Sequence, residues 1–196
     1  MTEKIYFNRQ EKLSEILENE NIDGLLISNL TNIRYISGFT GSAGTCLITN
    51  KGNFFITDGR YIEQSKNQVK GFKRYIDMSS HLEIIKKNNL IFDGMKIGFE
   101  ADHVNFTLYE SMLNIFPNIK WEGTKMILED LASVKDRTEL DAIRVAVEIT
   151  DKVYEEILPM LRPGYTEKQV ANTLVSKYRE YGDGEAYSPI VATGPN

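Results

Sequence analysis

The chain has few of the residues that stabilise secreted proteins or anchor membrane proteins. Its 196 residues include one cysteine, Cys46, and two histidines, His81 and His103. A single cysteine cannot form an internal disulfide, which is typical of a reducing compartment. No apolar run approaches the roughly 20 residues that cross a bilayer, and the N-terminus lacks the apolar stretch of a signal peptide. We therefore expect a cytoplasmic protein with no membrane partner.

The chain also lacks a concentrated cluster of positive charge. The net charge is −5, and the lysines and arginines are dispersed rather than gathered in a basic stripe. This distribution excludes nucleic acid and anionic lipid as expected partners. Hydrophobic residues make up 41% of the chain, enough for a sizeable core. With no repeat or low-complexity segment, this length fits one large domain, or one domain plus part of another.

Strand and helix patterns alternate in the first part of the chain. The predicted helices span residues 9–19 (with Asn8 as N-cap), 61–69, 81–87 and 105–116. The predicted strands span residues 22–27, 45–49, 53–57, 72–76, 96–99 and 118–121. Strands 45–49 and 53–57 flank a short loop with Gly52, which predicts a hairpin. This alternation favours an α/β domain whose central sheet is covered on both faces.

The second part is mainly helical. Apolar residues at spacings of three and four predict one long helix from Asp136, which ends before residues 162–164. Thr166 caps a second helix, with Gln169 completing a capping box, and Gly182 ends it. Residues 186–193 have the pattern of a strand. The change near residues 126–132 divides the chain into domains 1–128 and 129–196.

Three segments carry a resemblance to a known family. They are NIRYISGFTGSAGT at 32–45, FFITDGRY at 54–61, and a series from LASVK at 131–135 through RPGYTE at 162–167 to IVATG at 190–194. In order and spacing they resemble the Xaa-Pro aminopeptidases and prolidases, the creatinase-like "pita-bread" metallopeptidases. The resemblance implies a creatinase/prolidase N-terminal domain over 1–128, with a mixed β-sheet flanked by helices. It also implies the start of a pita-bread catalytic domain over 129–196.

The resemblance places the catalytic chemistry outside this chain. Enzymes of this kind use two divalent metal ions, expected here to be manganese, held by aspartate, histidine and glutamate residues that follow the segment at 190–194. The chain is therefore expected to hold no catalytic residue, no metal ligand and no cofactor, and to be inactive alone. In such enzymes the N-terminal domain of one subunit often lines the active-site mouth of another. That arrangement implies a homo-oligomer, and it gives Asn32 and Arg34 a possible substrate-binding role. A solvated arginine on a loop is the alternative for Arg34.

Other candidate sites are weaker. Gly38, Gly41 and Gly44 predict a tight turn that leads into the hairpin, because the following strand leaves no helix N-terminus for a phosphate. His103, Asp102 and Glu100 are too close in sequence to converge on a metal. Two further residues have structural interpretations: Cys46 as a buried apolar residue and Asp58 as the N-cap of the helix that follows it.

The leading hypothesis is the N-terminal portion of an enzyme that cleaves between an N-terminal residue and proline. Proline defeats ordinary peptidases because it lacks an amide hydrogen and constrains its neighbour. The alternatives are an Xaa-Pro dipeptidase, a hydrolase of creatine-like amidines, and a non-catalytic interaction module on the same fold. The strand at 186–193 is expected to lack sheet partners, which predicts self-association or disorder of the last ten or so residues.

Overall fold

The computed structural model describes residues 2–194. It divides into two compact units, one ending at Val134 and the other beginning at Lys135. The sequence placed the boundary between residues 128 and 129. The difference is helix α6 (Ile127–Ser133), which packs on the first unit through the buried Leu128.

The first unit is built on a six-stranded mixed sheet, which confirms the predicted fold class. The strands are β1 (Gly24–Ile27), β2 (Thr45–Thr49), β3 (Gly52–Thr57), β4 (Lys73–Ile76), β5 (Lys96–Glu100) and β6 (Lys120–Thr124). Their order in the sheet is β4-β3-β2-β1-β5-β6. Strand β2 is antiparallel to both of its neighbours, whereas the β1–β5, β5–β6 and β3–β4 pairs are parallel. Five strands therefore run in one direction and β2 runs against them.

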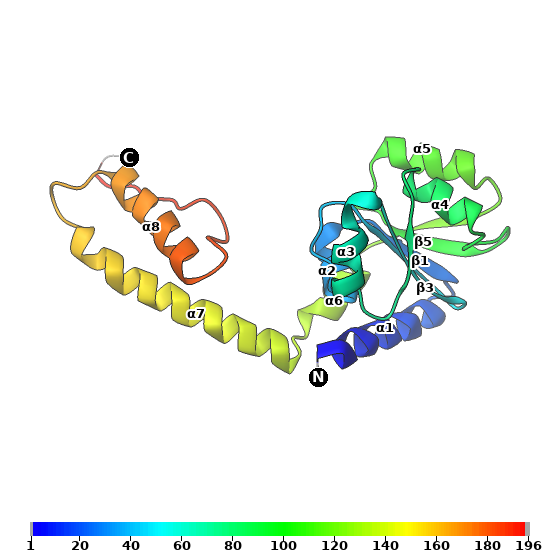
Figure 1. Ribbon diagram of the computed structural model, residues 1–196, viewed down its shortest axis with the longest axis horizontal. Coiled ribbons are helices and arrows are strands. Elements are labelled where there is room, and N and C mark those ends of the chain that lie inside the picture. Colours follow the sequence, from blue (N-terminus) through cyan, green and yellow to red (C-terminus); the bar gives the residue numbers. More distant parts are fainter. Residues whose placement is uncertain (1, 195–196) are drawn as a thin grey trace. The chain divides into compact units, whose positions relative to one another are not determined.

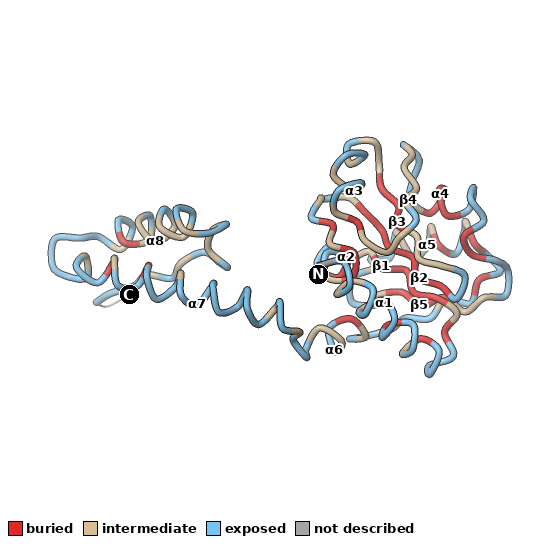
Figure 2. Tube along the Cα trace, turned by 60° about the horizontal axis from the view of Figure 1, so that its bottom comes forward, coloured by how far each residue is buried: buried red, intermediate tan, exposed pale blue. Residues whose placement is uncertain are grey.

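The core lies on both faces of this sheet, because successive strand residues point to opposite sides. In β1, Leu25 and Ile27 join one buried cluster and Leu26 joins the other. In β2, Cys46 and Ile48 lie on the first side and Leu47 on the second. Figure 2 shows the resulting run of buried residues through the central strands. The predicted burial of Cys46 is confirmed.

Helices cover the two faces. The helices of the first unit are α1 (Thr2–Asn19), α2 (Leu30–Ser37), α3 (Ile62–Gln68), α4 (His81–Lys87), α5 (Phe106–Ile115) and α6. Figure 1 shows α1, α2, α3 and α6 on one side of the sheet and α4 and α5 on the other. Apolar side chains of α1, α2 and α6 join the first cluster, and those of α4 and α5 join the second. The hairpin and helix α4 lie where the sequence placed them.

Helices α1 and α2 of the first unit differ from the prediction. Helix α1 begins at Thr2, so Asn8 lies inside it and is not its N-cap. An ion pair between Glu3 and Lys70, with Nζ 2.9 Å from Oε1, joins the added first turn to the loop after α3. Helix α2 was not predicted, because it has only eight residues and is followed directly by residues 38–44, which contain Gly38, Gly41 and Gly44 and are called the glycine-rich loop below. Asn29 caps its start, and Gly38, at φ +84°, ends it.

The second unit contains α7 (Arg137–Ile157), the short helix η2 (Leu158–Met160) and α8 (Glu167–Tyr181). Asp136 and Glu139 form a capping box at the start of α7, as do Thr166 and Gln169 at the start of α8, which confirms the latter prediction. Helices α7 and α8 contact each other, and the only buried apolar residues of this unit among those described are Val153, Ile157 and Val170. Lys177 of α8 also pairs with a carboxylate of α7, 2.9 Å from Glu156 Oε2.

The strand predicted at 186–193 is absent, since those residues form irregular backbone. A strand pattern produces a strand only where a neighbouring strand accepts its hydrogen bonds, and no described segment of the second unit offers one. Instead, Thr193 N donates to Glu167 Oε1 at 2.7 Å.

Candidate functional site

The first unit gathers its polar side chains at one edge of the sheet. Because β1, β3, β4, β5 and β6 run in the same direction, their carboxyl ends meet there together with the start of β2. The residues at these ends are polar: Ser28, Thr45, Asp58, Asp77, Glu100 and Thr124. The carboxyl edge of a parallel sheet is where ligands bind in open α/β folds. We therefore take it as the candidate functional region.

The glycine-rich loop between α2 and β2 crosses this edge and rests on aromatic rings. A Cβ on Gly41 would lie 2.3 Å from the ring of Phe39 and 2.7 Å from that of Tyr61, so only glycine fits there. The Tyr61 hydroxyl lies 2.7 Å from Ser42 Oγ and accepts a hydrogen bond from Ser42 N at 3.3 Å. The predicted tight turn is thus held in place by the residue that follows Asp58-Gly59-Arg60.

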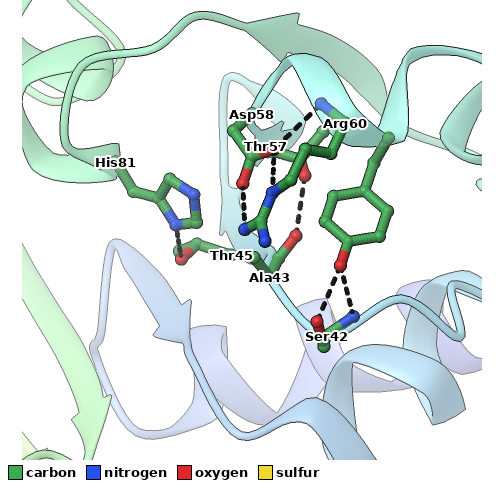
Figure 3. A network of polar contacts seen from close by, with 8 residues as sticks. Ser42, Ala43, Thr45, Thr57, Asp58, Arg60 and His81 are labelled. Carbon is green, nitrogen blue, oxygen red and sulfur yellow. Dashed lines mark hydrogen bonds and ion pairs between the residues drawn. The ribbon is translucent and has the colours of Figure 1, made fainter.

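Figure 3 shows the polar network behind this loop. The Arg60 guanidinium donates to both carboxylate oxygens of Asp58, at 2.9 and 2.8 Å, and this hydrogen bonding lowers the pKa of Asp58 to about 2. Asp58 also accepts from Arg60 N, which confirms its predicted capping role. Because the Arg60 side chain is 68% exposed, the pair contributes little to stability.

His81 is held beside the same loop. Its Nδ1 lies 2.7 Å from Thr45 Oγ1. Thr57 Oγ1 also donates to the carbonyl oxygen of Ala43 at 2.7 Å, which fixes the loop to β3. Burial lowers the pKa of His81, an effect that the nearby charge of Asp58 partly opposes. The imidazole is therefore neutral at neutral pH.

Asn32, one of the two substrate-binding residues predicted from the sequence, is only 6% exposed. Its Nδ2 donates to Glu100 Oε1 and to Glu129 Oε1, both at 2.7 Å. The other oxygen of Glu100 accepts from Ser28 N and Asn29 N, at 2.7 and 2.8 Å. Asn32 thus connects the start of α2 to β5 and α6.

Arg34, the other predicted residue, is exposed on α2 rather than on a loop. Residues two positions apart in a helix point in different directions, so the structure does not bring Arg34 and Asn32 together. Sequence reasoning did not assign a role to Glu100 or His81. The signal that could have found Glu100 is a charged residue at the carboxyl end of a buried strand.

Metal and nucleophile chemistry find no support in the residues that the structure describes. No group of three or more histidine, cysteine, aspartate or glutamate side chains among them could hold a metal ion. The donors needed for two divalent ions are therefore not assembled in residues 2–194. Burial raises the pKa of the Cys46 thiol, which makes it a poor nucleophile. No helix in the same part of the chain is long and apolar enough to span a bilayer.

Comparison with known protein families matches both units. Residues 9–134 match the creatinase/prolidase N-terminal domain, and residues 141–196 match metallopeptidase family M24. The chain belongs to the creatinase/prolidase family. Residues 32–45 and 54–61, which carried the resemblance, lie inside the first match, and they form α2, the glycine-rich loop and the end of β3.

Individual relatives agree with this assignment. An uncharacterized peptidase of Bacillus subtilis is 35% identical over 94% of this chain and 52% of its own length. The structure of an Xaa-Pro dipeptidase from Bacillus anthracis superposes with a TM-score of 0.83 at 30% identity, over 89% of this chain and 49% of that one. The structure of an X-Pro aminopeptidase from Thermotoga maritima superposes with a TM-score of 0.74 at 30% identity. The match covers 88% of this chain and 49% of that one. The chain thus spans about half the length of the relatives it matches.

Proposed function

We propose that this chain is the amino-terminal portion of a metal-dependent Xaa-Pro aminopeptidase, which hydrolyses the bond between an N-terminal residue and proline. The observation that carries the proposal is the order of the two family matches, an N-terminal creatinase/prolidase domain followed by the beginning of an M24 metallopeptidase domain. The similarity to a solved X-Pro aminopeptidase supports it.

On this proposal the described residues contribute no catalytic group. Divalent metal ions, which we expect to be manganese, are held by the remainder of the M24 domain in the longer protein. The chain alone is then inactive, and the longer protein acts in the cytoplasm on peptides that carry proline at the second position.

The first unit has two proposed roles, oligomerisation and control of access to the active site. Arg34 suits the second role, because its exposed guanidinium has five donors in a planar fork that matches a peptide carboxylate or carbonyl. Asn32 contributes indirectly, because its amide donor bonds with Glu100 and Glu129 and keeps α2 in position.

The test compares this chain with the product of its full reading frame. Both are incubated with manganese and an Xaa-Pro peptide such as Ala-Pro-Ala, and release of the N-terminal residue is measured. Hydrolysis by the longer product alone supports the proposal. Failure of both proteins to cleave Ala-Pro-Ala in the presence of manganese, zinc or cobalt overturns it. If neither protein cleaves the dipeptide Ala-Pro either, a non-catalytic interaction module on the same fold is favoured.

An Xaa-Pro dipeptidase is the second candidate, and it is favoured by the similarity to the Bacillus anthracis dipeptidase. The same assay distinguishes the two enzymes by substrate length. An aminopeptidase cleaves Ala-Pro-Ala at the first bond, whereas a dipeptidase cleaves Ala-Pro and leaves the tripeptide intact. Creatine provides the corresponding control for an amidine hydrolase.

A further inference from the structure

The carboxyl edge of the sheet contains a cavity of about 400 Å³ beside the glycine-rich loop. It is lined by the end of β1, residues 42–45, the start of α4 and one side of α5. Its lining includes five branched aliphatic side chains: Leu26, Leu30, Leu82, Leu108 and Ile115. This volume falls within the roughly 300–1,000 Å³ of small-molecule pockets.

The position of the cavity is that of a ligand site in α/β folds. The cavity lies beside the carboxyl end of β1 and the start of β2. Ligands in open α/β folds bind outside the carboxyl ends of strands. The start of α4, where His81 lies, forms part of the cavity wall.

The lining limits the charge of the ligand. No aspartate, glutamate, lysine or arginine is among the residues that line the cavity, and burial keeps the His81 imidazole neutral at neutral pH. A charged ligand would lose its hydration without gaining an opposite charge. The ligand is therefore uncharged.

The hydrogen bonds within the lining limit the polar groups that the ligand can carry. Ser42, Ser80 and Ser111 bond with Tyr61, Glu83 and Thr107 of the same chain. His81 uses Nδ1 for Thr45, and among the described residues its Nε2 has no hydrogen-bond partner. Since the Thr45 hydroxyl can donate or accept, the imidazole can adopt either tautomer, and Nε2 can accept or donate accordingly.

We propose that this cavity binds a small uncharged molecule with an aromatic or branched aliphatic body and one hydrogen-bonding atom, which contacts His81 Nε2. The site is complete within the first unit. It does not depend on the proposed peptidase activity, so the two proposals fail separately.

The experiment uses indole as a probe, because it is apolar, neutral and has one N–H donor. The isotope-labelled 196-residue chain is titrated and followed by NMR. Saturable shifts are expected at residues 42–45, 80–82 and 108–115, with a dissociation constant of about 1 mM or lower, a normal value for about nine non-hydrogen atoms. Indole-3-carboxylate and tryptamine should bind at least about tenfold more weakly, because the lining has no opposite charge.

Two variants on α5 test the location. Ser111→Phe places a ring in the cavity and should abolish the shifts, whereas Leu113→Phe, at an exposed position of the same helix, should leave them unchanged. His81→Phe retains the apolar wall and removes Nε2, so the affinity should fall about threefold to tenfold. Unfolding temperatures confirm that each variant is folded.

Several outcomes overturn the proposal. These are shifts confined to residues 135–194, equal binding of the charged analogues, and unchanged binding by Ser111→Phe. If the chemical shifts of these residues change with protein concentration, the surface would instead be assigned to contact with a second copy of the chain.

Discussion

At the scale of single residues, Asn32 has a structural role and Arg34 has a proposed binding role. They lie two positions apart on the same helix, yet one is buried between two carboxylates and the other faces solvent. Their substitution therefore distinguishes support of α2 from contact with a peptide.

Asn32→Ala should lower the free energy of unfolding by about 1–3 kcal/mol, because two carboxylates lose a shared buried donor. Arg34→Ala should change it by less than about 0.5 kcal/mol, as is usual for exposed positions. Urea unfolding of both variants measures the difference. In the longer protein, Arg34→Ala should raise KM for proline peptides. Equal stability of the two variants would contradict the role given to Asn32.

His81 predicts a pH dependence of stability. Burial holds its pKa in the folded protein below the ordinary histidine value of about 6.5, so the unfolded chain binds more protons between the two values. The free energy of unfolding should therefore fall as the pH drops below about 6.5. Asp58, with a pKa of about 2, loses its contribution only at lower pH.

The measurement is urea unfolding at pH values from about 5 to 7. His81→Gln should reduce the slope of stability against pH in this range, and the matched change His103→Gln, at an exposed position, should not. An unchanged slope in His81→Gln would show that another group is responsible.

At the scale of elements, local sequence patterns predicted some segments better than others. The hairpin of β2 and β3 and helix α4 follow from turn and capping residues within a few positions. Helix α2 was not predicted, because it has only eight residues and leads into the glycine-rich loop. The segment 186–193 has strand residues but no neighbouring strand among the described residues, and hydrogen bonds to a partner are what a strand requires.

The same limit applies to the candidate site. Asp58 as a cap and Cys46 as a buried residue were predictable, because each depends on adjacent residues. The bonds of Glu100 with Ser28 and Asn29 join positions more than 70 apart in sequence. The pairing of Thr45 with His81 likewise depends on the packing of α4 against the sheet. No local pattern encodes such distant contacts.

Helix α7 exposes apolar side chains that repeat at spacings of three and four along one of its faces. Leu140, Ile143 and Val147 remain 43%, 46% and 52% exposed, and Figure 2 shows most of the helix as exposed. An apolar surface of this kind favours association with another protein surface.

We therefore expect the chain to self-associate through α7. The double change Ile143→Lys and Val147→Lys should lower the sedimentation coefficient toward that of a monomer. The matched double change Asn172→Lys and Ser176→Lys adds the same charge at exposed positions of α8 and should leave association unchanged. Equal behaviour of the two variants would place the contact elsewhere.

At the scale of the whole molecule, the two units differ in how much core each has. The first unit holds both large buried clusters, whereas the second buries only three apolar side chains among its described residues. A domain with its own core folds independently.

A protein of residues 1–134 should therefore unfold cooperatively, with dispersed NMR signals that overlay those of the same residues in the 196-residue chain. Residues 135–196 alone should show helical circular dichroism without a cooperative transition. A fragment 1–134 that is unfolded in buffer would contradict this division.

The antiparallel strand beside the centre of the sheet has a consequence for the order of folding. Thr49 pairs with Gly52 across the hairpin, whereas Gly24 of β1 pairs with Ile97 of β5, much further along the chain. Contacts between distant residues form later, because closing a longer loop costs more entropy. Strands β1, β2 and β3 should therefore assemble first, and β5, α5 and β6 should join them last. In pulsed hydrogen exchange during refolding, the amides of β2 and β3 should gain protection before those of β5 and β6.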